Sequence, residues 1–274
     1  MTNRWASSSL SGAGNVFTAL HSGLTVDRIA TPANLLATCT QDEAVCDVLE
    51  RNRPDFDFIP VVDANSRFIG MFNASTHRGH WTPGTIWGCF VPLSEEYLIG
   101  ADASILDFII DADQRPCRLV ISGARIVGLV SHSDLQKLPV RAALFALITG
   151  FEITMTEFIK NKYSDDSAWL NTLPPKRQQK IEDELLKAKA DDSYVDSLLF
   201  TQFCDKARIV ADQFSGRRCK SLEVTFEKIE NLRNQVAHAN DYAASPSDAN
   251  GVCEVVRELL ELRDELQRGF AAGK

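Results

Sequence analysis

The feature that most constrains the fold of this chain is an internal repeat with a period of about 60 residues. Each copy has a helical pattern and then two apolar runs separated by a short turn, in the order 42–51, 58–63 and 67–72, then 105–109, 117–122 and 125–130. Short β-rich runs joined by a turn predict pairs of strands. A copy of this size could not easily bury its sheet alone, so the repeat predicts two similar α/β halves packed on each other.

The pattern changes after about residue 135, where helical spacing replaces short apolar runs. It predicts helices over 135–162 and again from 178 to the end, about four main helices in all. The stretch SPSDANG (245–251) is rich in turn-forming residues and predicts a loop before a last helix over 252–268. The apolar segment 137–151 runs from the repeat into this region and predicts a stiff joint between the two.

Composition narrows the class of protein further. The chain has 274 residues, of which 45% are hydrophobic, enough for two modest cores. No apolar run approaches the roughly 20 residues that a membrane helix needs, so we expect no membrane contact. Residues 1–18 are rich in Ser and Gly and predict a flexible tail without the apolar stretch of a secretory signal. Seven scattered cysteines without a CxxC pair predict reduced, mostly buried thiols in a cytoplasmic protein.

The formal charge of -8 counts against indiscriminate binding of nucleic acid, which rests on Lys and Arg. The two halves, 1–150 and 151–274, each hold four more acidic than basic side chains. Any contact with nucleic acid must therefore be local. We predict no metal site, because the histidines do not cluster and the pair His77 and His80 falls in a loop pattern.

The second copy carries a group of residues suited to binding a nucleotide. Gly128 ends a strand where a ligand could approach the backbone closely. Ser131 and Asp134 follow three residues apart, on one face of the first helical turn, where a carboxylate can accept from a ribose diol. The helix N-terminus adds free N–H groups that favour phosphate. The alternative is that the string SHSD only caps a helix.

The segment 117–141 resembles the closing half of a CBS motif, the unit that pairs into Bateman modules. Gly128, Ser131 and Asp134 stand at its G-h-x-S/T-x-x-D positions, and Arg118 resembles the phosphate-contacting basic residue of the family. The resemblance implies an adenine nucleotide (AMP-, ADP- or ATP-like) as regulatory ligand. The first copy departs from the motif, with the residues Asn73, Thr76 and Phe58 in place of the hydroxyl, the carboxylate and the base. We therefore expect one competent site per chain.

A second group of candidate residues, Arg233, Asn234 and His238, lies in the helical half. Cleavage of RNA without a metal needs a side chain that titrates near neutral pH, which histidine supplies. It also needs a fixed cation for the charge that develops on phosphorus, and Arg supplies several donors. The string R-N-x-x-x-H resembles the motif of the HEPN superfamily. That resemblance implies a metal-independent ribonuclease whose two motif copies meet in a dimer.

The geometry of a straight helix complicates this motif. An apolar stripe includes the position of Arg233 and is formed by Leu222, Phe226, Ile229 and Val236. His238 lies about 140° away from Arg233 around the helix axis. Either the helix is distorted, or the site is composed across a dimer. The alternative is that Arg233 pairs with an acid such as Glu230 or Glu157 and that His238 is solvated near a helix end.

Together these patterns predict an α+β chain in which an α/β pair precedes an all-α bundle. The tandem CBS pair is expected over 19–140, with copies at 19–86 and 87–140, and the HEPN-like bundle over 141–274. The resulting hypothesis is an adenine-nucleotide-regulated, metal-independent endoribonuclease of the toxin, antiphage or RNA-processing type, acting on RNA as a homodimer. The alternative is a non-catalytic nucleotide-sensing regulatory or dimerisation protein with a residual motif.

Overall fold

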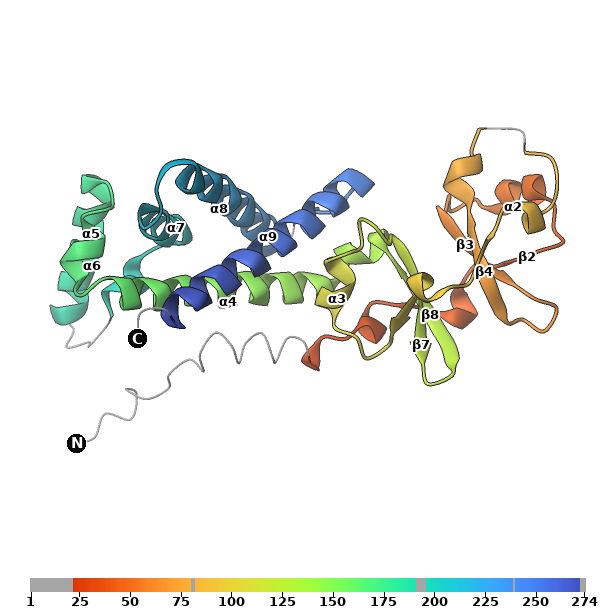
Figure 1. Ribbon diagram of the computed structural model, residues 1–274, viewed down its shortest axis with the longest axis horizontal. Coiled ribbons are helices and arrows are strands. Elements are labelled where there is room, and N and C mark those ends of the chain that lie inside the picture. The colour runs from red at the N-terminus through yellow and green to blue at the C-terminus, as the bar shows by residue number, and fades with distance from the viewer. Residues whose placement is uncertain (1–21, 80–81, 191–195, 239, 272–274) are drawn as a thin grey trace. The chain divides into compact units, whose positions relative to one another are not determined.

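The computed structural model describes residues 22–79, 82–190, 196–238 and 240–271 (Figure 1). The chain forms two compact units, one comprising Leu24–Lys137 and one built on Leu138–Lys274. Sheets in the first unit and helices in the second confirm the predicted α+β class. The tail predicted over 1–18 lies outside the described residues.

The boundary between the units falls at Lys137, three residues before the predicted position. Lys137 has extended backbone (φ -65°, ψ 146°) between the short helix η6 (His132–Gln136) and the helix α4 (Leu138–Lys162), so no single helix crosses the boundary. Pro139 explains the start of α4. It lacks an N–H and fits the first turn of a helix, whereas it would disrupt one that ran on from η6.

Two four-stranded sheets form the N-terminal unit, with the orders β2-β3-β4-β5 and β1-β8-β7-β6. The strands are β1 (Thr31–Pro32), β2 (Cys39–Thr40), β3 (Phe58–Val62), β4 (Phe68–Asn73), β5 (Val91–Pro92), β6 (Leu98–Gly100), β7 (Cys117–Ser122) and β8 (Arg125–Ser131). The helices are α2 (Val45–Arg51) and α3 (Ile105–Ile109), with η1 (Val26–Arg28), η2 (Ala33–Leu35), η3 (Ala74–His77), η4 (Ile86–Gly88), η5 (Glu95–Tyr97) and η6. The helix, strand, turn and strand of each predicted copy are all present.

Each sheet is completed by a strand from the other copy. β1 pairs with β8 of the second copy, and β5 pairs with β4 of the first. The backbone repeats this exchange at a spacing of 60 residues, because Val26 N donates to Ala103 O and Ile86 N to Glu43 O, both at 2.9 Å. A boundary at 86/87 therefore does not separate the two sheets.

Alternation along the strands produces separate cores on the two faces of the sheets. One core lies between α2 and its sheet and includes Ile59, Val61 and Phe72. Another includes Met71 of β4 together with Cys117 and Leu119 of β7, and joins the two sheets. Side chains one residue apart on a strand thus belong to different cores.

The second unit is helical. Its elements are α4, α5 (Asp166–Leu170), α6 (Pro175–Ala190), η7 (Ser197–Phe200), α7 (Phe203–Asp212), α8 (Gly216–Ala237) and α9 (Pro246–Ala271). α4 packs against α7, α8 and α9 (Figure 1). Phe151 of α4, Phe203 of α7 and Phe226 of α8 join these helices, with ring centroids 6.2 to 6.5 Å apart.

α4 corrects the expectation that no apolar run reaches the length of a membrane span. Its 25 residues have a mean hydropathy of 1.5, long and apolar enough to cross a bilayer. Glu152 and several small residues interrupt the run, so the sequence alone shows no continuous apolar stretch of this length. In this structure 56% of that apolar window is buried inside the protein, as in the central helix of a bundle.

The start of α9 corrects the loop predicted over 245–251. Ser245 caps this helix: its Oγ accepts from Asp248 N at 3.2 Å, while its backbone N donates to Asp248 Oδ2 at 3.1 Å. Pro246 is the first helical residue, where its missing N–H costs nothing. Turn-forming residues in this order make a helix N-terminus rather than a loop.

Candidate functional site

A cavity of about 360 Å³ opens in the N-terminal unit beside the S-x-x-D turn. Three segments line it: the chain from β1 past η2 (31 and 35–37), the loop entering β3 (54–58 and 60), and the ends of β7 and β8 with the turn after them (116–117, 129 and 131–133). Because β1 belongs to the first copy and β8 to the second, the strand exchange builds this cavity.

The walls of the cavity are mainly apolar. Leu35 and Phe56 line it although their side chains are 69% and 46% exposed, an unusual exposure for large apolar residues unless something covers them. Burial raises the pKa of the Cys117 thiol in the wall to about 12, so it stays protonated. Hydroxyls of Thr31 and Ser131 supply polar groups, and no Lys or Arg is among the described residues that line the cavity.

Ser131 and Asp134 have different places in the turn. Ser131 lines the cavity, and its Oγ lies 2.9 Å from that of Ser133, which also lines it. Asp134 is only 4% exposed and lies behind the wall, where its Oδ2 accepts from Ser131 N at 2.6 Å and its Oδ1 pairs with Lys137 Nζ at 2.7 Å. The helix-capping alternative therefore describes Asp134, while Ser131 faces the cavity as well.

Gly128 makes room for backbone rather than for a ligand. A Cβ at this position would lie 2.5 Å from the carbonyl oxygen of Thr31 in β1. Gly70 has the same role in the first copy, where a Cβ would lie 2.4 Å from Val91 O of β5. The two glycines pair with Pro32 and Pro92, again 60 residues apart.

Arg118 points to the other side of its strand. Its guanidinium bonds to the Asp111 carboxylate and to Phe108 O (3.3 Å), and lies 5.4 Å from the centroid of the Phe108 ring. Its neighbour Cys117 lines the cavity, so alternation turns Arg118 towards α3. Burial lowers the pKa of Arg118, an effect that Asp111 opposes.

The strand register also corrects the comparison of Arg118 with Phe58. Arg118 pairs with Val130, and Ile59 pairs with Phe72 at the equivalent position of the first sheet. Phe58 is instead the counterpart of Cys117, and both line the cavity. Equivalent residues of these two strands are 59 positions apart rather than 60, and the bulge lies at the same place in both hairpins (Val61/Val62 and Val120/Ile121).

Several residues that line the cavity were not predicted from the sequence as ligand-binding residues. His132 lines the cavity, and its Nε2 donates to the carbonyl of Ala112. Burial lowers the pKa of His132, although the hydrogen bond to Ala112 works against this effect. Asp55 and Asp57 also line the cavity and share the guanidinium of Arg78, at 2.7 and 3.0 Å.

The motif residues of the helical unit lie at the C-terminal end of α8. Arg233 is half-buried at the edge of the apolar stripe, while Asn234 and His238 are exposed. No side-chain hydrogen bond or ion pair involves these three residues within the described ranges, so Arg233 pairs with neither Glu230 nor Glu157 there. His238 is the C-cap of the helix, in the solvated position that the alternative expected.

α8 is regular between the two key side chains. The helix continues to Ala237, and His238 N donates to Asn234 O at 3.0 Å, the ordinary i to i−4 bond. The separation of about 140° expected for five helical residues therefore holds. A distorted helix therefore does not bring Arg233 and His238 together within one chain.

The end of α8 is held by a residue that the sequence had not indicated. Arg141, in the first turn of α4, donates from Nη1 to Gln235 O (3.2 Å) and Val236 O (3.0 Å), and from Nη2 to Asn240 O (2.9 Å). A cation in the first turn of its own helix is unfavourable for the helix dipole. An Arg at this unfavourable position is the one feature of the sequence that could have indicated a specific role for Arg141.

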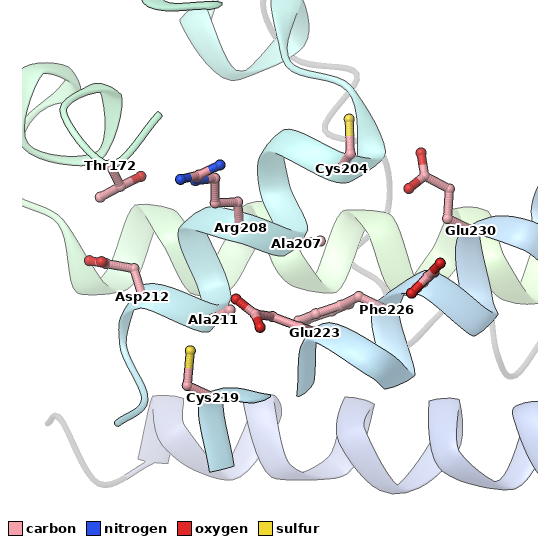
Figure 2. Close-up of a pocket in the computed structure, with 11 residues that line it drawn as sticks. Thr172, Cys204, Ala207, Arg208, Ala211, Asp212, Cys219, Glu223, Phe226 and Glu230 are labelled. Carbon is pink, nitrogen blue, oxygen red and sulfur yellow. The ribbon is translucent and has the colours of Figure 1, made fainter. Parts of the chain in front are cut away.

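A second cavity, of about 460 Å³, lies between α7 and α8 and is acidic (Figure 2). Arg208 is the single basic residue among its described lining, which includes the acids Asp212, Glu223, Glu227 and Glu230. None of the three motif residues lines it. Because these carboxylates repel phosphates, this cavity does not suit an anionic ligand.

Metal ligands do not gather in the part of the chain that the structure describes: no group of three or more His, Cys, Asp or Glu side chains there could hold an ion. His80 lies outside the described residues. His77 stacks on Phe72, with ring centroids 5.3 Å apart.

No family model and no curated protein matches this sequence. Among solved structures, the CBS domain of the bacterial CNNM/CorC family Mg2+ transporter in complex with ATP is similar at 15% identity and a TM-score of 0.39, over 47% of this chain and 94% of that one. CBSX2 in complex with AMP is 17% identical, with a TM-score of 0.36, over 44% and 97% of the two chains. CBS domains of a transcriptional regulator from Streptococcus pneumoniae are 16% identical, with a TM-score of 0.34, over 41% and 96%.

Proposed function

We propose that the N-terminal unit is a tandem CBS pair that binds an adenine nucleotide in the 360 Å³ cavity. The cavity itself carries this proposal. Its volume and largely apolar walls with a few convergent hydroxyls are those of a small-molecule site. The exposed apolar side chains of Leu35 and Phe56 gain a partner if a flat aromatic base lies against them.

The lining residues suggest how such a ligand is held. The base lies against the apolar walls, and the hydroxyls of Ser131 and Ser133 face the ribose. The phosphates extend towards solvent, because no Lys or Arg of the described chain lines the cavity and Asp55 and Asp57 do. Gly128, Asp134 and Arg118 support the site through the strand, the turn and α3, respectively.

Isothermal titration with AMP, ADP, ATP and adenosine tests the proposal. We expect binding of AMP, and affinities for ADP and ATP within about threefold of it, since added phosphates gain no cation. Leu35→Asp should weaken binding at least about tenfold, because it places a charge against the base. Val127→Asp is the control, since Val127 is also exposed, at 40%, but does not line the cavity. Absence of binding to all four compounds contradicts the proposal.

For the helical unit we propose a HEPN-like, metal-independent ribonuclease, on the observation that Arg233, Asn234 and His238 stand at one helix end without described partners. His238 would act as general base or acid, Arg233 would stabilise the charge on phosphorus, and Asn234 would position the phosphate. Since one regular helix separates Arg233 from His238 by about 140°, two copies of the chain must supply the site.

Incubation of the purified protein with total RNA in the presence of chelator tests this second function. We expect cleavage that is lost in His238→Ala and retained in His77→Ala, a control in the other unit. Sedimentation should show a dimer under the conditions of cleavage. RNA that stays intact, or that His238→Ala still cleaves, leaves the non-catalytic nucleotide sensor with a residual motif as the function.

Control of the nuclease by nucleotide is the third part of the proposal. It requires the ligand to bind two states of the protein with different affinity. The rate of RNA cleavage should differ between measurements with and without saturating AMP. Equal rates would contradict control of the nuclease by the nucleotide.

A further inference from the structure

The guanidinium of Arg141 forms hydrogen bonds on both sides of His238, at the C-terminal end of α8. Its two terminal nitrogens reach the carbonyls of Gln235 and Val236 on one side of His238 and that of Asn240 on the other, at 2.9 to 3.2 Å. Its carbon lies 4.9 Å from the ring centroid of Tyr242, so an aromatic face supports the cation from a further direction. Four contacts fix one side chain at one place.

These contacts satisfy a local need of α8. The last carbonyls of a helix have no partner within the helix and carry partial negative charge. Asn240 N donates to Gln235 O at 3.0 Å, the bond that closes a Schellman-type end, and Arg141 gives Gln235 O a second donor and Val236 O a donor. An Arg fork suits several acceptors at once, which the single ammonium of Lys does not.

The platform under Arg141 is rigid. Tyr242 is 3% exposed, and burial raises the pKa of its phenol to about 12, so the ring stays neutral below the cation. Arg141 also lies on the central helix of the unit, which packs against α7, α8 and α9. These contacts therefore tie the exposed end of α8 to the central helix of the unit.

We propose that Arg141 is a positioning residue for His238 in the ribonuclease reaction. The inference rests on the proposed nuclease function. Arg141 is not assigned to the phosphate, since both of its terminal nitrogens already donate to protein carbonyls. It fixes the backbone of the C-cap, and thereby the place from which the imidazole reaches the 2′-hydroxyl.

Kinetics of Arg141→Gln and Arg141→Lys form the first part of the test. A misplacement of about 1 Å at a catalytic group can lower the rate about a hundredfold, so we expect kcat of Arg141→Gln to fall about ten- to a hundredfold, with KM within about threefold. Arg141→Lys should recover part of kcat. Arg218→Gln is the control, since Arg218 lies near the other end of α8, paired with Glu265, and kcat should not change.

Amide hydrogen exchange, followed by NMR, forms the second part and does not depend on activity. Exchange at His238 and Asn240 should be at least about tenfold faster in Arg141→Gln than in the wild type, and unchanged in Arg218→Gln. Unchanged exchange in Arg141→Gln overturns the proposal, whatever happens to kcat. If the wild type does not cleave RNA, the nuclease function fails, and faster exchange still shows that Arg141 holds the turn.

Discussion

The two copies of the N-terminal repeat share a backbone but close their turns with different chemistry. In the first copy, Asn73 Oδ1 accepts from Ser75 Oγ at 2.7 Å, and Thr76 Oγ1 donates to Asn73 O at 2.9 Å. In the second copy, the Asp134 carboxylate accepts a hydrogen bond from the backbone N of Ser131. Each of these turns follows directly after a strand. A polar residue that distinguishes one copy from the other is therefore not automatically a ligand contact, and each one has to be located.

The largest effect is expected where the copies are alike. Gly128→Ala should lower the free energy of unfolding of the N-terminal unit by about 3 kcal/mol, because its Cβ would meet the Thr31 carbonyl and push β1 off β8. Gly70→Ala should cost a similar amount. Gly88→Ala, which meets nothing within 4 Å, is the control for denaturant unfolding. A harmless Gly128→Ala would show that the exchanged strand contributes little.

A smaller effect is expected at Arg118, where the copies differ. Arg118→Leu should lower the free energy of unfolding by about 2 kcal/mol and leave AMP affinity within about twofold. Loss of a buried partner costs about 3–5 kcal/mol, but the Asp111 side chain is 29% exposed and can turn to water. Arg115→Ala, which removes a more exposed partner of Asp111, is the comparison. Normal stability with lost AMP binding would restore the phosphate-contact role of Arg118.

The hydroxyl at the cavity should matter more for binding than for stability. Ser131→Ala should weaken AMP binding by about 1 kcal/mol, about fivefold, as expected for one lost hydrogen bond. Asn73→Ala, at the equivalent position of the first copy, should leave affinity unchanged. Equal losses in both variants, measured by titration calorimetry, would mean that the ligand does not distinguish the copies.

The smallest effect concerns pH. Burial lowers the pKa of His132 in the folded protein, so below the ordinary histidine pKa the unfolded chain binds a proton that the folded chain does not. Stability should therefore fall as pH decreases from about 6.5 towards the lowered value, by less than about 1.4 kcal/mol per pH unit. The thermal midpoint of His132→Gln should lack this part of the slope. An identical pH profile in both proteins would contradict it.

The sequence predicted the architecture well where periodicity determined it. Apolar alternation and the 60-residue spacing predicted the paired hairpins and their helices, and helical spacing predicted the second unit. The crossed strands were missed because two residues such as Thr31 and Pro32 form too short a pattern, although Pro32 and Pro92 share the repeat spacing. The start of α9 was predicted as a loop because the segment is rich in turn-forming residues. The order of those residues, S-P-S-D, is that of a helix N-cap.

The candidate sites were harder to predict, because they depend on which face a side chain takes. Ser131 does line the cavity, but equivalent residues of the two strands are 59 positions apart rather than 60, so Phe58 was compared with Arg118 in place of Cys117. The motif on α8 could be found by spacing alone. Arg141 is 97 residues away from His238 in the sequence, and no local pattern links them.

The exchanged strands have a consequence for how the N-terminal unit can be cut. A fragment that begins after Pro32 loses β1 and leaves the donors and acceptors along β8 open, and such a bare edge invites other chains to pair with it. We therefore expect that neither copy folds when it is expressed alone. The two copies should therefore unfold together in a single thermal transition.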